Sequence, residues 1–159
     1  MKIEMTQIGI IRSPHLEKEG MPIQPSGAEG VPGRVEIFAE FQPGLADLEG
    51  FSHVILLYHF HRSGDFKLRV IPFLDSQPHG VFSTRAPRRP SPIGLSIVPL
   101  EKISDGVLYI NNVDILDETP LLDIKPYVPE FDQQKSTRTG WLEKSGDEVV
   151  EKKSDGRFE

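Results

Sequence analysis

The 159-residue sequence contains no cysteine and no long hydrophobic run. The lack of cysteine excludes disulfide bonds, thiolate metal sites and cysteine nucleophiles. No segment approaches the ~18 consecutive apolar residues that a membrane-spanning helix needs. No charged-then-apolar leader opens the chain either, so we expect a cytoplasmic protein without membrane contact. With 37% hydrophobic and 26% charged residues, the chain can bury a globular core of about one domain.

Long helices are also lacking, because glycine and proline, at 14 residues each, interrupt the chain too often. Alternating apolar residues predict a half-buried strand over 34–41. The nearly continuous apolar run over 53–60 predicts a strand buried on both faces. Further strand candidates lie at 2–12, 67–71, 80–84, 93–98, 107–110 and 112–116. This pattern predicts a mostly β fold, a small antiparallel β-barrel-like domain with short helical turns and no Rossmann sheet.

The net charge of −6 conceals an uneven distribution. Residues 53–100 carry six basic and two acidic side chains, a net charge of +4, and four of the five histidines. The segments before and after them are net negative, at −4 and −6. An anionic ligand would therefore meet the middle of the chain, although ordinary scatter of surface charge gives the same count.

Known nucleotide motifs are missing. Gly27, Gly30 and Gly33 recur every third residue, which matches neither the dinucleotide-binding fingerprint nor a P-loop. His59 and His61 would share one face of a strand and could reach one metal ion. No third and fourth ligand are evident, so hydrogen-bonding histidines are the simpler interpretation and no metal site is predicted. A metal-dependent β-barrel enzyme remains an alternative.

The most unusual segment is 85–94, where Arg85, Arg88 and Arg89 are interleaved with three prolines. Proline holds the backbone extended, so these guanidinium groups lose little freedom on binding an anion. The segment therefore predicts contact with a carboxylate or phosphate. The alternative is a solvated connector.

A second unusual segment, 114–127, interleaves acidic and apolar residues. Buried backbone in such a loop can read an adenine edge, and a carboxylate can bond a ribose hydroxyl or an ammonium group. A purely structural alternative is that Asp117 caps a turn and Asp123 pairs with Lys125. Both can hold at once.

Together these segments resemble one family. The pattern R-x-x-x-R-P-x-P-I-G-x-S at 85–96 and the block D-x-x-D-x-T-P-x-x-D-I-K-P-Y at 114–127 are similar to the tRNA N6-threonylcarbamoyladenosine methyltransferases. An opening I-G-x-I-R-S-P at 8–14 and a central G-F-S-H-x-x-x-L-x-x-F-H at 50–61 resemble the same family. Two positions depart from its pattern: Ser91 replaces a usual asparagine, and Glu118 replaces a usual glycine. Glu118 brings a preference against positive φ into its turn.

The resemblance implies a homodimer that binds S-adenosylmethionine without a Rossmann fold and methylates N6 of threonylcarbamoyladenosine next to the tRNA anticodon. Residues 1–135 would form this methyltransferase β-barrel domain, and 136–159 a polar C-terminal extension. By position in the motifs, the expected cofactor contacts are Gln24, Pro25, Ser26, His61, Arg62, Arg85, Leu95, Asp114, Ile115, Leu116 and Asp117.

Loss of the N6 proton must accompany or precede attack on the methyl group, so a base is required. The candidates are Asp117, His61, Tyr127 and the carboxylate of the substrate itself. Arg88, Arg89 and Lys125 are the expected contacts to RNA or to the threonyl carboxylate. A non-catalytic module that binds a nucleoside or S-adenosylmethionine is the remaining alternative.

Overall fold

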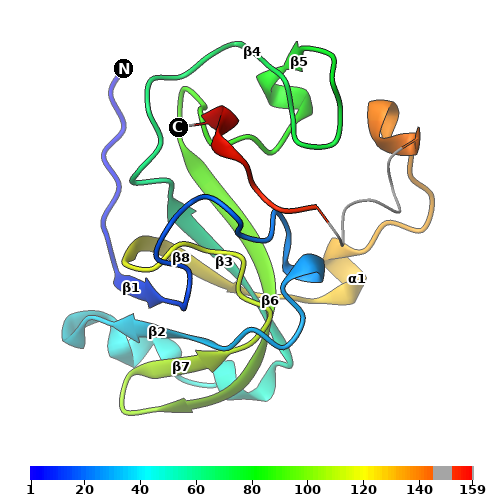
Figure 1. Cartoon of the computed structure of the whole chain (residues 1–159). Coiled ribbons are helices and arrows are strands. Elements are labelled where there is room, and N and C mark those ends of the chain that lie inside the picture. Colours follow the sequence, from blue (N-terminus) through cyan, green and yellow to red (C-terminus); the bar gives the residue numbers. More distant parts are fainter. Residues whose placement is uncertain (145–151, 159) are drawn as a thin grey trace.

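The computed structural model describes residues 1–144 and 152–158. Its main feature is a closed antiparallel barrel of six strands in the order β1-β2-β7-β6-β3-β8, with a separate two-stranded sheet of β4 and β5 (Figure 1). This confirms the predicted mostly β, barrel-like fold. The strands are β1 (Gly9–Arg12), β2 (Gly33–Ile37), β3 (His53–His59), β4 (Arg69–Val70), β5 (His79–Gly80), β6 (Ile93–Ser104), β7 (Val107–Ile110) and β8 (Thr119–Pro126).

Helical structure among the described residues is short. One α-helical turn, α1 (Pro129–Asp132), follows the barrel. None of the described helices is long and apolar enough to cross a membrane. The 3-10 turns are η1 (Pro25–Gly27), η2 (Ala39–Leu45), η3 (Leu48–Gly50), η4 (Val81–Ser83), η5 (Gly140–Lys144) and η7 (Gly156–Phe158).

The core fills the barrel interior and follows from strand alternation. In β3, Val54, Leu56 and Tyr58 are buried, while the residues between them are only partly covered. Successive side chains of a strand point to opposite faces, so one face of β3 packs inside the barrel and the other faces outward. The expectation that β3 is buried on both faces was therefore wrong. Its outward apolar side chains are left without full cover.

The predicted strand over 34–41 ends early. β2 stops at Ile37, and the chain turns into η2, where Phe41 donates its backbone N–H to Phe38 O. Phe41 still packs against the core, but from a helical turn. The Gln42 side chain also donates to Ile37 O at 3.0 Å, satisfying the carbonyl at the strand end. Similarly, η4 takes most of the strand predicted over 80–84, and β1 begins only at Gly9.

The chain around residue 115 differs most from expectation. The predicted strand 112–116 is a loop, and the unpredicted β8 follows it. Asn112 adopts φ 56°, which ends the extended conformation. Val113 and Ile115 are nevertheless fully buried, so the alternating pattern reflected burial in a loop.

Three long connections leave the same end of the barrel. The register places the last residues of β1, β3 and β7 beside the first residues of β2, β6 and β8. Connections 13–32, 60–92 and 111–118 therefore all emerge there, at what we call the loop end. Tyr127 lies at the opposite end, where its N–H bonds His53 O. Six residue steps along β3 separate the two ends, about 20 Å.

The connection 60–92, which we call the excursion, has a small core of its own. Val70, Val81 and Ala86 are buried together, with Phe73 packed against them. In Figure 1 the excursion, which includes β4 and β5, lies above the barrel strands. Residues 152–158, which we call the C-terminal segment, reach it. There Arg157 Nη1 donates to Pro72 O at 2.6 Å.

Candidate functional site

A string of polar groups leads from inside the barrel to the loop end. Tyr58 from β3 and Ser96 from β6 face the interior, with 5% and 1% of their surface exposed. Their hydroxyls lie 3.0 Å apart, and Ser96 Oγ donates to Asp114 Oδ1 at 2.7 Å. Asp114 belongs to connection 111–118, so a buried serine joins two strands to this loop.

Gly94 explains how the tyrosine fits. It pairs with Tyr58 across β3 and β6, and a Cβ at this position would collide with the Tyr58 ring. The glycine therefore leaves the space that the ring occupies. Gly94 leaves room for the Tyr58 ring, and Ser96 contacts its hydroxyl, so these two positions of the P-I-G-x-S pattern both accommodate Tyr58.

Electrostatics make Asp114 unusual among the described carboxylates. Burial raises its pKa to about 6, although the Ser96 hydrogen bond and the charge of Arg85 both oppose the shift. Burial and the nearby Asp114 charge likewise raise the pKa of Tyr58, so this phenol stays protonated. Asp114 is therefore the titratable member of the string near neutral pH.

Arg85 connects the string to the first long connection. Its Nη1 donates to Gln24 Oε1 at 3.0 Å, and its charge acts on both Asp114 and Tyr58. Gln24 directly precedes η1, and η1 packs beside β6. Arg85 therefore contacts Gln24 and lies near enough to Asp114 for its charge to act on that carboxylate, so residues from three different connections come close at the loop end. Leu95 lies on the outer face of β6, 44% exposed.

The rest of the 114–117 turn is attached to the chain after β1. Ser13 Oγ donates to Ile115 O at 2.6 Å, and Ser13 N–H donates to Asp117 Oδ1 at 3.0 Å. Asp117 N–H in turn bonds His15 O. Ile115 and Leu116 are buried beneath the turn. The opening I-R-S-P segment thus fixes the turn, a contact that sequence spacing could not show.

Arg62 holds the excursion to connection 13–32, and His61 directly precedes Arg62. Arg62 Nη1 donates to Leu16 O at 3.0 Å, and its Nη2 lies 3.5 Å from Glu17 Oε2. Burial, followed by the charge of Arg62, lowers the pKa of His61, so the imidazole is neutral at pH 7. Within residues 1–144 and 152–158, no three His, Asp or Glu side chains are placed to hold a metal ion.

The proposed RNA contacts are dispersed. Arg89 Nη1 donates to Thr84 O at 2.7 Å and to Val81 O at 3.1 Å, so it satisfies carbonyls of the excursion. The Arg88 guanidinium lies beside Gly64, also in the excursion. Lys125 Nζ is 2.8 Å from Asp123 Oδ2 on β8. The structure thus brings Arg88 and Arg89 near the loop end but leaves Lys125 and Tyr127 towards the opposite end.

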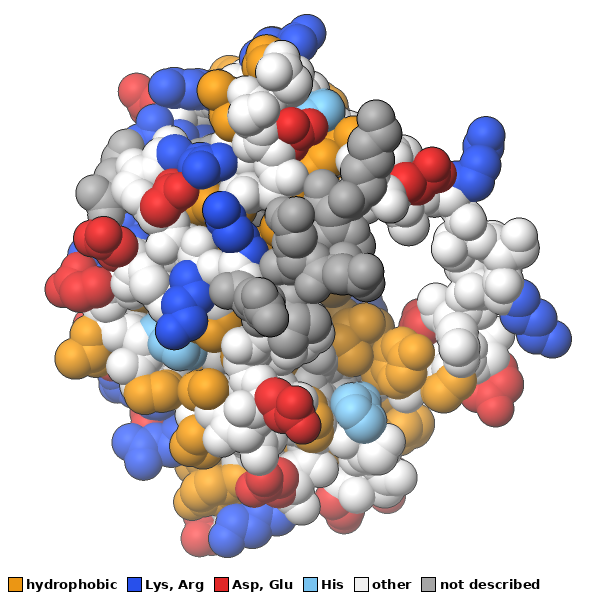
Figure 2. Space-filling model, turned by 45° about the vertical axis from the view of Figure 1, so that its right-hand side comes forward, with side chains coloured by type: hydrophobic (Ala, Val, Ile, Leu, Met, Phe, Trp, Pro, Cys, Tyr) orange, Lys and Arg blue, Asp and Glu red, His pale blue; other side chains and the backbone are white. Residues whose placement is uncertain are grey.

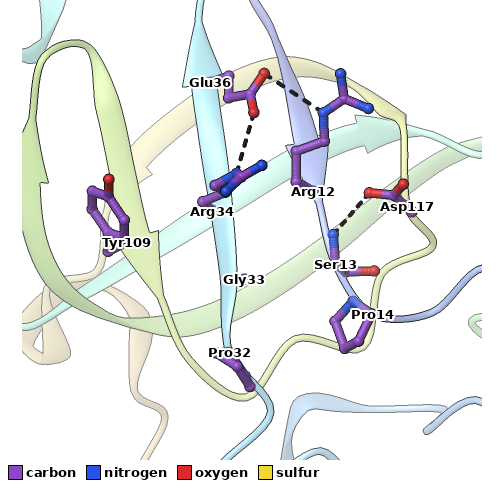
Figure 3. Close-up of a pocket in the computed structure, with 9 residues that line it drawn as sticks. All are labelled: Arg12, Ser13, Pro14, Pro32, Gly33, Arg34, Glu36, Tyr109 and Asp117. Atoms are coloured by element: carbon purple, nitrogen blue, oxygen red, sulfur yellow. Dashed lines mark hydrogen bonds and ion pairs between the residues drawn. The ribbon is translucent and has the colours of Figure 1, made fainter.

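A shallow hollow of about 560 Å³ lies on the outside of the barrel near Asp117. In Figure 3 the Glu36 carboxylate points between Arg12 and Arg34. Its Oε2 lies 3.6 Å from Arg12 Nε, and its Oε1 lies 3.2 Å from Arg34 Nε. Alternation in β2 predicts outward side chains here, but no sequence pattern indicated the hollow. It is lined by Arg12, Ser13, Pro14, Pro32, Gly33, Arg34, Glu36, Tyr109 and Asp117.

Known proteins share this sequence and fold. A "probable S-adenosyl-L-methionine-binding protein" of Pyrococcus abyssi is 54% identical over 95% of this chain and 82% of its own length. A human "tRNA (adenine(37)-N6)-methyltransferase" is 38% identical over 81% of this chain, but only 31% of its own length. The chain thus spans most of the first relative and about a third of the second.

Solved structures agree. The crystal structure of TrmO from Pseudomonas aeruginosa superposes with a TM-score of 0.75 at 40% identity, covering 89% of this chain and 63% of that one. The family model described as the tRNA-methyltransferase O N-terminal domain matches residues 10–133, which include the barrel strands except for Gly9, and the residues of the loop-end site. The chain therefore belongs to the tRNA-methyltransferase O N-terminal domain family.

Proposed function

We propose that the chain is an S-adenosylmethionine-dependent methyltransferase that methylates N6 of threonylcarbamoyladenosine next to the tRNA anticodon. One observation carries the proposal: in a member of this family, Gln24, Arg85 and Asp114 come close at the loop end. The names of the relatives indicate the cofactor and the adenine position. A tRNA substrate would place the protein in the cytoplasm.

The side chains at the loop end fit the chemistry of S-adenosylmethionine. Arg85 offers a guanidinium for its carboxylate, and Asp114 an acceptor for its ammonium or ribose groups. Leu95 offers exposed apolar surface. We propose that residues 1–135 form the methyltransferase domain and 136–159 a polar extension. The proposed contacts are Gln24, Pro25, Ser26, His61, Arg62, Arg85, Leu95, Asp114, Ile115, Leu116 and Asp117.

The bound sulfonium supplies an already activated methyl group. The chain then has to orient the nucleophilic nitrogen, exclude water and receive a proton. Besides the carboxylate of the substrate, the chain offers three candidate bases: Asp117 accepts the Ser13 N–H at Oδ1, and Tyr127 lies at the end remote from Gln24 and Arg85. His61 is neutral at pH 7 and so could accept a proton.

The RNA would dock on the excursion. This connection holds six basic and two acidic residues, whereas the whole chain is net negative. Figure 2 shows basic side chains, interspersed with acidic ones, over the upper half of one face, the height at which the excursion lies in Figure 1. Splayed loop nucleotides can be read by such a local patch. Arg88 and Arg89 are the proposed contacts there to phosphate or to the threonyl carboxylate, and Lys125, towards the opposite end of the barrel, is a proposed RNA contact outside the excursion.

We further propose a homodimer through the outer face of β6. Ile93, Leu95 and Ile97 are 38%, 44% and 37% exposed there and form one apolar stripe. Ile55 and Leu57 of β3 pair with Ile97 and Leu95 and extend it. A second copy would cover this stripe and bring each site close to the subunit interface, because Leu95 belongs to both.

The test is calorimetric titration of the purified chain with S-adenosylmethionine, before and after chelator treatment. We expect binding that survives chelation and that Arg85→Ala weakens about tenfold or more, the effect of losing a hydrogen bond to a charged group. Arg69→Ala, in the same excursion, is the matched control. Methyl transfer is then assayed on threonylcarbamoylated tRNA. No binding by folded protein would contradict the proposal and favour a non-catalytic module.

A further inference from the structure

Ser96 is a buried hydroxyl in an otherwise apolar part of β6. It lies between Gly94 and Val98 on the inward face of the strand, and it is 1% exposed. Burying such a group costs free energy unless it is hydrogen-bonded. Ser96 avoids that cost by contacting Tyr58 on one side and Asp114 on the other. Both of its partners are polar groups that also had to be taken out of water.

In the string formed by Tyr58, Ser96 and Asp114, both hydroxyls donate in the direction of Asp114. Because Ser96 Oγ gives its proton to Asp114 Oδ1, the contact with Tyr58 is satisfied when the phenol donates to Ser96. The carboxylate thus receives a hydrogen bond from a hydroxyl that is itself an acceptor. Such chains fix the position of their last member. That last member is Asp114, the most exposed of the three.

We propose that Asp114 accepts the proton that leaves the methylated nitrogen, and that Ser96 and Tyr58 are positioning residues that hold its carboxylate at the loop end. This inference rests on the proposed function and assigns the base that the function requires. It moves Asp114 from a cofactor contact to a catalytic residue. Tyr127 lies at the opposite end of the barrel, and the rivals are His61, Asp117 and the carboxylate of the substrate itself.

The balance of the step is simple. Asp114 takes the proton from N6, and the electron pair of the N–H bond remains on nitrogen, whose bond to the methyl carbon forms. The electron pair of the former carbon–sulfur bond leaves with sulfur, which becomes a neutral thioether. The carboxylic acid of Asp114 then returns its proton to solvent. No oxidant, reductant or metal is consumed.

The surroundings suit this task. The groups that face Asp114 are Tyr58 from β3, Ser96 from β6 and Arg85 from the excursion. With its pKa raised to about 6, Asp114 is ionised at neutral pH yet more basic than an ordinary carboxylate. A base is most effective when its pKa lies near the working pH. Arg85 supplies the opposite charge that keeps the ionised form accessible.

The first test is Asp114→Asn, which keeps an oxygen for Ser96 but cannot take a proton. We expect kcat to fall about 10²- to 10⁴-fold, the usual contribution of general base catalysis. Because the Asn oxygen can still accept a hydrogen bond from the cofactor, the affinity for S-adenosylmethionine, measured by calorimetry, should change less than threefold. Asp105→Asn, at the exposed turn between β6 and β7, is the matched control and should leave both quantities unchanged.

The second test is Ser96→Ala in the full chain. The Ser96 hydrogen bond lowers the pKa of Asp114, so its loss should raise that pKa. The kcat of wild type should rise with pH through about 6, and in Ser96→Ala this rise should move to higher pH. A carboxyl NMR titration of Asp114 should show the same displacement without any turnover. If Asp114 were not the base, the NMR titration would move and the kcat curve would stay in place.

The outcomes separate this inference from the function. If wild type neither binds S-adenosylmethionine nor methylates tRNA, the proposed function fails. If wild type is active and Asp114→Asn keeps its kcat, Asp114 is not the base. If Asp114→Asn loses cofactor binding as well, Asp114 is a cofactor ligand and the inference is overturned. A folded Asp114→Asn that binds but does not turn over, with the pH shift in Ser96→Ala, supports it.

Discussion

Glu118 has a strained backbone conformation that lowers the stability of the folded chain. It has φ 62° in the turn before β8, in the left-handed region that glycine adopts without strain. Its side chain gains only an exposed ion pair, with Oε1 3.1 Å from Arg12 Nη1. An exposed ion pair contributes about 0–1 kcal/mol, whereas a non-glycine residue in this region costs about 1–2 kcal/mol. The strain is therefore the larger of the two effects.

We expect Glu118→Gly to raise the free energy of unfolding by about 0.5 kcal/mol or more. Glu118→Ala keeps the positive φ and loses the ion pair, so it should lower it slightly. Urea denaturation of both variants measures the difference. Equal shifts in the same direction would show that the backbone strain argument is wrong.

Asp114 should make folding stability depend on pH. Its folded pKa of about 6 lies above the ordinary value of 3.8, so the folded chain holds this proton more tightly than the unfolded chain does. Stability should therefore fall as pH rises from about 4 to 6, and stay lower above that. Asp114→Asn removes this loss. We expect it to be about 2–3 kcal/mol more stable than wild type at pH 7.5 and similar at pH 4. Urea denaturation at both pH values would contradict this if the difference were constant.

At the scale of elements, the C-terminal segment joins parts that are distant in sequence. Gly20 N–H bonds Ser154 O, and Ser154 N–H bonds Met21 O, so the segment pairs with connection 13–32. Arg157 reaches the excursion, where its guanidinium lies 5.4 Å from the centre of the Phe73 ring. The segment thus links two connections that supply Gln24 and Arg85. The prediction of a merely polar extension did not include this.

Arg157→Ala should loosen that link. We expect faster amide hydrogen exchange over residues 69–75 and a loss in overall stability of about 1 kcal/mol or less, because the lost contacts are at the surface. Lys153→Ala, an exposed side chain in the same segment, is the control and should leave exchange unchanged. Unaltered exchange in Arg157→Ala would show that the link does not restrain the excursion.

Element boundaries set the limit of prediction from sequence. Short apolar runs between Pro and Gly signals identified the positions of β3, β6 and β7, whereas strand period was the basis for the 34–41 prediction. It placed Phe41 in a strand, since an apolar residue at the expected period can also be buried by a 3-10 turn. The strand prediction at 112–116 mistook a buried loop for a strand. Periodicity reports which residues are buried and does not report the backbone that buries them.

Contacts across the fold were less predictable still. Motif resemblance selected Gln24, Arg85 and Asp114, and the structure brings them together. Nothing in the sequence linked Ser96 or Tyr58 to Asp114. The turn between β6 and β7 lies between Ser96 and Asp114, and the excursion and that same turn lie between Tyr58 and Asp114. The three meet only when the barrel closes. The sequence pattern around Arg89 likewise did not indicate that its guanidinium donates to backbone carbonyls of the excursion.

At the scale of the whole molecule, the outer apolar stripe predicts association. Ile97→Glu would place a charge in the centre of the proposed dimer interface, where it cannot be solvated. We expect light scattering to show a dimer for wild type and a monomer for Ile97→Glu, with the circular dichroism spectrum unchanged. Phe131→Glu, at a side chain 77% exposed in α1, is the control and should remain dimeric. A monomeric wild type would overturn the interface.

Closure of the barrel has a consequence for how the chain is made. Ile11 pairs with Thr119, and Gly9 with Leu121, so the first strand of the sheet is sealed by the last. During synthesis, more than a hundred residues must be added after residues 9–12 before β8 can pair with this edge of β1. Until then the nascent sheet has exposed edges able to pair with other chains. Such distant pairing also slows folding, so the growing polypeptide is most vulnerable to aggregation on the ribosome, just before β8 emerges.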